Sequence, residues 1–271
     1  MIMRTRLNQL VIGIKGAGEM ASGVAWRLYM ANLRKIFMLE IPEPVAVRRK
    51  VAFCEAVYDG HQTVEGVEAV KVTATEDLKR AWCAGRISVV VDPKGKLLQK
   101  QRPDVLIDAV LAKKNVGTTI TDAPLVIGLG PGFAAGKDVH LVIETNRGHN
   151  LGRIITTGSA EPDTGVPGAI GGHTETRVLR APVGGSFYAR RAIGDLVERG
   201  EIVGSVAGED VQVQIDGVLR GLIRSPRQVV RGLKLGDIDP RGNQRYCDTI
   251  SDKARAIAGS VLEAILRVYN T

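Results

Sequence analysis

The sequence predicts an α/β protein with an N-terminal parallel sheet, a β-rich second part and a C-terminal helix. Three observations predict this fold class. A short apolar run leads into a glycine loop and a helical pattern near the start, and strands alternate with helical stretches to about residue 115. Short β-type segments then fill residues 176–245, and an apolar stretch with helical periodicity ends the chain.

The first element is a strand, a glycine loop and a helix in immediate succession. The apolar run 10–14 precedes Gly16-Ala-Gly18-Glu-Met-Ala21, and a second apolar run ends at Glu40. This spacing is typical of a Rossmann-like nucleotide-binding unit, in which an acid follows the loop by about twenty residues. Gly16 would permit the turn, Gly18 the approach of a pyrophosphate, and Ala21 close packing on the sheet. Glu40 would accept hydrogen bonds from a ribose and favour NAD over NADP. The alternative is that the glycines serve packing alone.

Composition narrows the functional classes. The net charge of +8 suits an anionic ligand, but no basic block alternates with aromatic residues, which disfavours nucleic-acid binding. No run approaches the roughly 18 apolar residues that span a membrane. The three cysteines have no metal-type spacing and argue for a reducing compartment. We therefore expect a soluble, cytoplasmic protein that binds neither nucleic acid nor membrane.

Polar residues gather on short loops between residues 108 and 149. Rigid strands that present such loops are where binding sites usually form. We expect Lys113 and Arg147 to clamp a phosphate or carboxylate, and the backbone near Gly130 to hold an anion. The set predicted here is Lys113, Asn115, Gly130, Gly132 and Arg147. The alternative is that each of these residues only forms a turn or a cap at a crowded sheet edge.

No metal site is predicted in the same region. His140 and Glu144 share a face of a predicted strand but lie four residues apart, too far along a strand for one ion. A helical HExxH motif is absent from the sequence.

The second part of the chain contains a weak internal repeat. A shift of 32 residues aligns Gly185 with Gly217 and Gly204 with Gly236. Two such copies around a turn are typical of a flattened lipoyl/biotinyl-type barrel, a barrel-sandwich hybrid. The turn at 207–210 contains no lysine, so we expect no covalent lipoate or biotin. Chance glycine spacing in a β-meander is the alternative.

These patterns divide the chain into four parts. Residues 1–160 form a Rossmann-like nucleotide- or cofactor-binding domain, 161–175 a Gly/Pro-rich connection, and 176–245 the barrel domain. Residues 246–271 form a helix that packs back on the first domain. Cys247 lies just before the predicted cap of this helix, amid arginine and lysine residues, a setting that lowers a thiol pKa. Cys247 is therefore the candidate catalytic residue, and a small core residue is the alternative.

Long strings along the chain carry a resemblance to a known family: DAVLAKKNVGT, TDAPLVIGLGPGF, VIETNRGHNLGR, GVLRGL, KLGDIDPR and ISDKARAIAGSVLEAI. From about Leu10 to Leu266 the chain resembles the YqeB-type accessory proteins of selenium-dependent molybdenum hydroxylase systems. That family is distantly similar to XdhC-type molybdenum cofactor insertion factors.

The resemblance implies a maturation factor. Such a factor would bind an adenine nucleotide or a molybdopterin-type phosphate cofactor and dock on a selenium-dependent molybdenum hydroxylase. The alternative function is an NAD-dependent oxidoreductase acting on a small acid. The sequence does not decide whether the chain is an enzyme, and it leaves a homo-oligomer open.

Overall fold

The computed structural model describes residues 6–270, which fall into two compact units. Unit 1 is assembled from Met1–Pro44, Ala52–Asp163 and Ile250–Thr271, so it includes the end of the chain. Unit 2 is assembled from Val45–Val51 and Thr164–Thr249. The chain therefore enters unit 2 twice and returns to unit 1 for its last helix.

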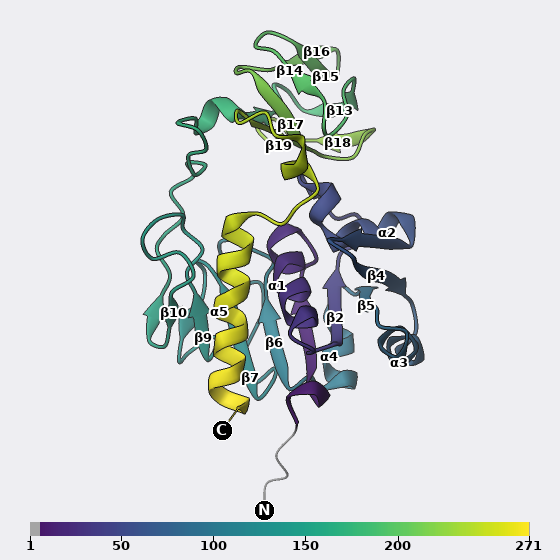
Figure 1. The fold of residues 1–271 in the computed structure, drawn as a ribbon, viewed down its shortest axis with the longest axis vertical. Coiled ribbons are helices and arrows are strands. Elements are labelled where there is room, and N and C mark those ends of the chain that lie inside the picture. Colours follow the sequence, from purple (N-terminus) through teal and green to yellow (C-terminus); the bar gives the residue numbers. More distant parts are fainter. Residues whose placement is uncertain (1–5, 271) are drawn as a thin grey trace, which may run out of the picture. The chain divides into compact units, whose positions relative to one another are not determined.

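Unit 1 is built on a nine-stranded mixed sheet (Figure 1). Its strands are β1 (Val11–Lys15), β2 (Lys35–Glu40), β3 (His61–Val64), β4 (Val67–Val72), β5 (Ile87–Val91), β6 (Val105–Asp108), β7 (Leu125–Leu129), β9 (Leu141–Ile143) and β10 (Ile154–Ile155). Seven strands run parallel in the order β9-β7-β6-β1-β2-β5-β4, and β10 and β3 pair antiparallel at the two edges. A separate two-stranded sheet contains β8 (Ala134–Ala135) and β11 (Gly158–Ser159).

Helices and loops cover the sheet of unit 1. The helices are α1 (Glu19–Met30), α2 (Ala56–Asp59), α3 (Thr75–Cys83), α4 (Lys96–Gln101) and α5 (Asp252–Tyr269). Phe37 of β2 packs with Leu78 of α3 and Leu97 of α4, while Leu106 of β6 packs with Phe133. Because the central strands are buried on both faces, they are almost continuously apolar.

Helices α1 and α5 lie side by side, although they come from opposite ends of the chain (Figure 1). Gly23 permits this close approach, because a Cβ there would lie 2.9 Å from the Cβ of Ala254. The turn between β3 and β4 adds a clamp: Glu65 accepts hydrogen bonds from Ile250 N–H (2.7 Å) and from Arg255 Nη2 (2.6 and 2.7 Å). Helix α5 is thus an integral layer of unit 1.

Unit 2 contains two antiparallel four-stranded sheets, with the orders β12-β19-β17-β14 and β16-β15-β13-β18. The strands are β12 (Val178–Arg180), β13 (Gly185–Ala189), β14 (Leu196–Val197), β15 (Ile202–Val206), β16 (Glu209–Gln212), β17 (Gly217–Leu222), β18 (Arg227–Val229) and β19 (Lys234–Asp239). Phe187, Val203, Leu219 and Ile238 come from both sheets and belong to one buried core.

The internal repeat of the sequence corresponds to two copies of three strands, β13-β14-β15 and β17-β18-β19, which begin at Gly185 and Gly217. Within each copy the long strands pair, β13 with β15 and β17 with β19. The short middle strands pair across copies, β14 with β17 and β18 with β13. The two copies are therefore interleaved.

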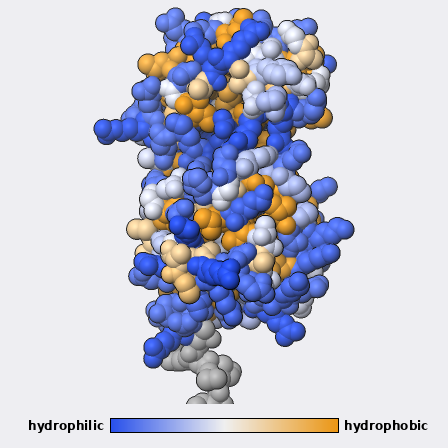
Figure 2. Space-filling view, turned by 90° about the vertical axis from the view of Figure 1, so that its right-hand side faces the viewer, coloured by the Kyte–Doolittle hydropathy of each residue, from blue (hydrophilic) through white to orange (hydrophobic). Residues whose placement is uncertain are grey.

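Short 3₁₀ helices connect these elements: η1 (Leu7–Gln9), η2 (Arg49–Val51), η3 (Phe53–Glu55), η4 (Glu175–Arg177) and η5 (Gln244–Cys247). Within residues 6–270, none of the helices combines the length and the apolar character that crossing a bilayer requires. On the face shown in Figure 2, hydrophilic residues interrupt the apolar ones.

The predicted fold class is wrong. The large sheet is mixed, not the parallel sheet of a Rossmann-like domain, because the chain forms hairpins at both edges. The second part is not a closed barrel of the lipoyl/biotinyl type: its strands form two separate sheets. Each sheet ends at strands of only two to four residues, β12, β14, β16 and β18, which are too short to pair onward and close a barrel. Periodicity indicated which residues are buried, but not sheet closure.

Candidate ligand-binding site

The carboxyl ends of β1, β2 and β6 meet at one edge of the large sheet. Ligands of open α/β sheets bind at this edge, because every loop that follows a parallel strand is displayed there. The loop after β1 is the predicted glycine loop, and α1 begins directly behind it.

Gly16 and Gly18 are glycines for different reasons. Gly16 has φ +87°, and a Cβ there would lie 3.1 Å from Ala109 O, so the turn itself requires glycine. Gly18 has φ −70° and ψ −173°, an extended conformation that any residue adopts, and a Cβ there would meet no described atom within 4 Å. The missing side chain at Gly18 leaves space beside the first turn of α1. Ala21 is fully buried and packs inward.

Glu40, at the end of β2, holds the glycine loop in place. Its Oε2 accepts a hydrogen bond from Ala17 N–H, and its Oε1 accepts one from Ile41 N–H, both at 2.8 Å. Burial raises the pKa of Glu40, and the two hydrogen bonds offset part of this rise. The sequence assigned Glu40 to a ribose, whereas both of its oxygens already bond to backbone amides of the protein.

A chain of polar groups connects β1 to β6. Lys15 Nζ donates to Thr118 Oγ1 (2.6 Å), and the Thr118 hydroxyl donates to Asp108 Oδ2 (2.5 Å). Asp108 and Thr118 are buried, and Lys15 also forms an ion pair with Asp122 (3.7 Å). These contacts fix the loop after β6 beside the glycine loop.

Three other predicted residues lie on the same edge but are engaged within the chain. Lys113 Nζ pairs with Asp163 (2.6 Å), and Arg147 donates two hydrogen bonds to Asp252 (2.6 and 3.0 Å). Asn115 Oδ1 accepts the N–H groups of the two residues that follow it by two and three positions, so it shapes its own loop. The predicted clamp thus already holds internal carboxylates.

Gly130 and Gly132, after β7, serve turns and close packing. Gly130 N–H donates to Ile143 O (2.9 Å), so it does not point to an anion. A Cβ at Gly132 would lie 2.6 Å from Lys114 Cα. Packing within the chain therefore accounts for both glycines.

Lys253 is a candidate that the sequence interpretation missed. It follows the cap of α5, Ser251, whose hydroxyl donates to Glu19 at the start of α1 (2.8 Å). Burial lowers the pKa of Lys253 and the charge of Arg147 lowers it further, while Glu19, Glu144 and Asp163 oppose the shift. Its ammonium forms no ion pair or hydrogen bond with any residue from 6 to 270.

The carboxylates near Lys253 bond to other groups. Asp163 pairs with Lys113, Asp252 with Arg147, and Glu144 accepts the backbone N–H groups of Asn146 and Glu161 (both 2.7 Å). A signal for Lys253 was present in the sequence, because a lysine in the first turn of a helix opposes the macrodipole. A residue that breaks a local rule often marks a functional site.

The structure places Cys247 in a setting different from the one that the sequence predicted. It lies in unit 2, is 1% exposed, and its Sγ is 4.0 Å from Leu219 O. Burial raises the pKa of the thiol and Asp248 raises it further, against the lowering effect of Lys50, Arg48 and Arg220. The helix expected to lower this pKa begins only at Asp252, in unit 1.

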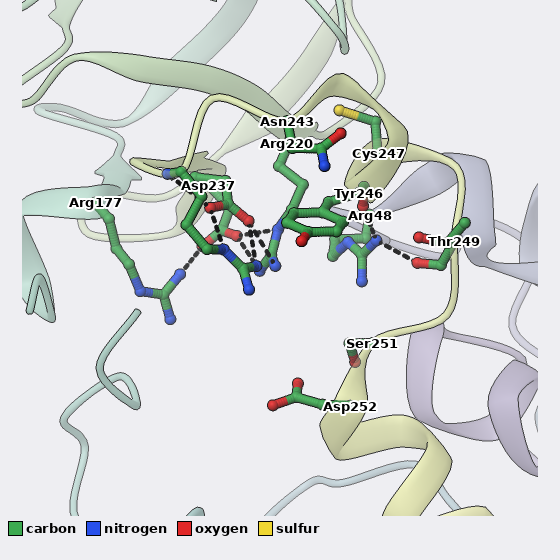
Figure 3. A network of polar contacts seen from close by, with 12 residues as sticks. Arg48, Arg177, Arg220, Asp237, Asn243, Tyr246, Cys247, Thr249, Ser251 and Asp252 are labelled. Carbon is green, nitrogen blue, oxygen red and sulfur yellow. Dashed lines mark hydrogen bonds and ion pairs between the residues drawn. The ribbon is translucent and has the colours of Figure 1, made fainter. Parts of the chain in front are cut away.

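Unit 2 also contains a buried network of ion pairs (Figure 3). Asp237 accepts hydrogen bonds from Arg177 and from Arg220 (2.6 and 3.0 Å). Asp239 accepts hydrogen bonds from Arg220 (3.2 Å) and from Arg241 (2.7 and 2.9 Å). The guanidinium of Arg177 also donates to a backbone carbonyl of the preceding loop. Because these donors face acceptors of the protein, the network organises unit 2.

A second arginine contact ties the segment 45–51 into unit 2. Arg48 Nη2 donates to Tyr246 O (2.6 Å) and Thr249 O (2.8 Å), as Figure 3 shows. Among the residues that the structure describes, no group of three His, Cys, Asp or Glu side chains could hold a metal ion.

Comparison with known proteins gives one relative of substantial identity, and no family model matches the chain. The chain is 49% identical over 263 residues to "Uncharacterized protein YqeB" of Escherichia coli (strain K12). The match covers 97% of this chain and 48% of that protein, so the chain spans about half the length of the curated relative.

The solved structures found are distant. They include an aspartoacylase family protein from Mesorhizobium loti (14% identity, TM-score 0.28) and a succinylglutamate desuccinylase/aspartoacylase from Rhodobacter sphaeroides (16% identity, TM-score 0.28). Each match covers 84% of this chain and 84% of the other chain. At this level of similarity the matches carry no functional argument.

The maturation prediction finds no support among these proteins. The E. coli relative is described only as uncharacterized, and none of the proteins named above is described as an XdhC-type or maturation factor. The assignment to a maturation factor of selenium-dependent molybdenum hydroxylases is therefore wrong, and so is the alternative of an NAD-dependent oxidoreductase. The hydroxylase partner stays a prediction that no comparison supports.

Proposed function

We propose that unit 1 binds a small phosphate-bearing ligand at the Gly16–Gly18 loop, and that an adenine nucleotide is the first candidate. The observation that carries this proposal is the space at Gly18. Neither its backbone conformation nor any neighbour within 4 Å requires glycine there, so the absence of a side chain favours an external group. That group would face the first turn of α1. The backbone N–H groups of this turn have no partner within the helix, because the first intrahelical hydrogen bond runs from Ser22 N–H to Gly18 O.

Lys253 supplies the charge that complements such an anion. Its ammonium is half-buried beside the start of α1, and the nearby carboxylates have their own hydrogen-bond donors. A partly desolvated ammonium without a carboxylate partner is stabilised by a phosphate, because a hydrogen bond between two charged groups is stronger than one between neutral groups.

Isothermal titration calorimetry with 5′-AMP, ADP and inorganic phosphate tests the site. Gly18→Val should abolish binding and lower the melting temperature only slightly, since the new side chain enters open space but valine is a poorer N-cap residue for α1 than glycine. Lys253→Met should weaken binding about 10- to 150-fold, the equivalent of about 1.5–3 kcal/mol for a charged hydrogen bond. Lys137→Met is the matched control, because this exposed lysine precedes β9 and so lies toward the opposite edge of the sheet.

The affinity should also depend on pH. Because the pKa of Lys253 lies below its ordinary value, the ammonium loses its proton earlier than a surface lysine does as the pH rises. Binding should therefore weaken at alkaline pH in the unmutated protein and less so in Lys253→Met. If the unmutated protein binds none of the three probes, or if Gly18→Val binds them equally well, the glycine loop is only structural.

A further inference from the structure

A cavity of about 170 Å³ lies farther along the same edge of the sheet, where β4 and β5 end. Val90 and Leu97 contribute apolar surface to it, and Thr75 contributes a hydroxyl group. Two cations, Lys96 and Lys100 of α4, also line the cavity. This combination of an apolar wall and a cationic rim suits an organic ligand that carries a negative charge.

The two lysines have no carboxylate partner. Lys96 and Lys100 lie one helical turn apart on α4, a spacing that places like charges on the same side of a helix, where they repel. Neither ammonium forms an ion pair or hydrogen bond with another residue in the described part of the chain. Asp92 also lines the cavity, but its Oδ2 accepts the Leu97 N–H (2.7 Å). Two cations therefore face one carboxylate that is already bonded.

The order of the strands places the cavity and the glycine loop along the same edge of the sheet. β1, β2, β5 and β4 are neighbours in that order, and Asp92 N–H donates to the backbone oxygen of Glu40 (2.9 Å). With strands about 4.8 Å apart, the ends of β5 and β4 lie roughly 10–14 Å from that of β1. The carboxylate of Glu40 lies between them in this order, but it bonds to Ala17 and Ile41 and does not line the cavity.

We propose that this cavity binds a second phosphate group, carried on the sugar of the same nucleotide. The ligand is then an adenosine bisphosphate-type nucleotide, with its 5′-phosphate at Gly18 and its sugar phosphate at Lys96 and Lys100. This inference rests on the proposed function and names its ligand class. It also reverses the sequence-based expectation that Glu40 excludes a phosphate on the ribose.

The test compares three probes that differ by one phosphate: 5′-AMP, adenosine 2′,5′-bisphosphate and adenosine 3′,5′-bisphosphate. Calorimetry on the unmutated chain should show that one bisphosphate binds about tenfold more tightly than 5′-AMP, and the two isomers identify the position of the phosphate. In Lys96→Met/Lys100→Met the ratio of the two affinities should fall to about one. Lys79→Met, an exposed lysine on α3 that does not line the cavity, should keep the ratio.

The outcomes separate this inference from the proposed function. If 5′-AMP binds but neither bisphosphate binds more tightly, or if the double variant keeps the ratio, the second site is refuted and the first stands. If 5′-AMP does not bind but a bisphosphate binds in a manner that depends on the two lysines, the cavity stands and the glycine-loop site fails. If no probe binds, both are refuted.

Discussion

Replacing Asp237 by asparagine should destabilise unit 2 strongly. Asp237 is 1% exposed, and its two oxygens face the guanidinium groups of Arg177 and Arg220 and, at 3.4 Å, the ammonium of Lys234. Asparagine keeps the shape of the side chain but removes its charge. The two buried arginines then lose the negative charge of Asp237, although the amide oxygen can still accept a hydrogen bond. Arg220 keeps the charge of Asp239, and Arg177 keeps a backbone carbonyl as acceptor.

The size of the effect follows from the burial of the network. Removing one partner from a buried ion pair costs about 3–5 kcal/mol, because it leaves an uncompensated charge in the interior. Since both arginines keep one acceptor, we expect about 3 kcal/mol, a large part of the 5–15 kcal/mol that typically stabilises a folded protein. With a urea m-value of about 1–3 kcal/mol/M, the midpoint should fall by roughly 1–3 M.

The position of the tryptophans allows the assay to distinguish the two units. Both tryptophans, Trp26 and Trp82, lie in unit 1, so their fluorescence reports that unit, while far-UV circular dichroism reports both. In Asp237→Asn the dichroism should begin to change at lower urea than the fluorescence. Asp210→Asn is the control, because its ion pair with Arg190 is exposed on both sides and should contribute less than about 1 kcal/mol.

The effect should depend on pH in a defined direction. Burial raises the pKa of Asp237, but the charges of Lys234, Arg220 and Arg177 outweigh it and hold the pKa below its ordinary value. The stabilisation is therefore complete above the unfolded-state pKa of about 3.9 and is lost as the pH falls through the folded-state pKa. The stabilities of the two proteins should begin to converge as the pH falls below about 4, and they should become equal only below the depressed folded-state pKa of Asp237. If Asp237→Asn unfolds at the same urea concentration as the unmutated chain at pH 7, the network does not stabilise unit 2.

Two further predictions concern packing and the thiols. Gly23→Ala should lower the stability of unit 1 by about 1–3 kcal/mol, because the new Cβ meets Ala254. Gly259→Ala on α5 should instead raise the stability by about 0.5–1 kcal/mol, because a Cβ there meets no described atom within 4 Å. Tryptophan fluorescence during urea unfolding measures both, and equal effects would contradict the close approach of the helices. Iodoacetamide at pH 7–8 should label the exposed Cys83 first, because burial protects Cys54 and Cys247 and the pKa of Cys247 is raised. Labelling of Cys247 as fast as Cys83 would show that it is accessible.

The sequence predicted local features better than global ones. The strand, glycine loop and helix at 11–30 follow from local rules of periodicity and turn geometry, and the structure has β1 and α1 there. The mixed edges of the sheet and the open sheets of unit 2 depend on which strands pair over long distances, and short segments such as β14 carry almost no pattern of their own. The same holds for Cys247: a count of nearby positive charges suggested a lowered thiol pKa, but burial and Asp248 raise this pKa. Lys113 and Arg147 are of the type expected at an anion site, yet only the tertiary structure shows the carboxylates they already hold.

The pairing of α1 with α5 also has a consequence for biosynthesis. The surface of α1 that contacts Ala254 is translated about 230 residues before Ala254 itself. At about 5–20 residues per second, that surface waits roughly 10–50 s for its partner, which is much longer than the time in which local helices form. Unit 1 can therefore reach its final packing only after translation has passed α5, and shorter nascent chains leave the surface of α1 that α5 covers exposed.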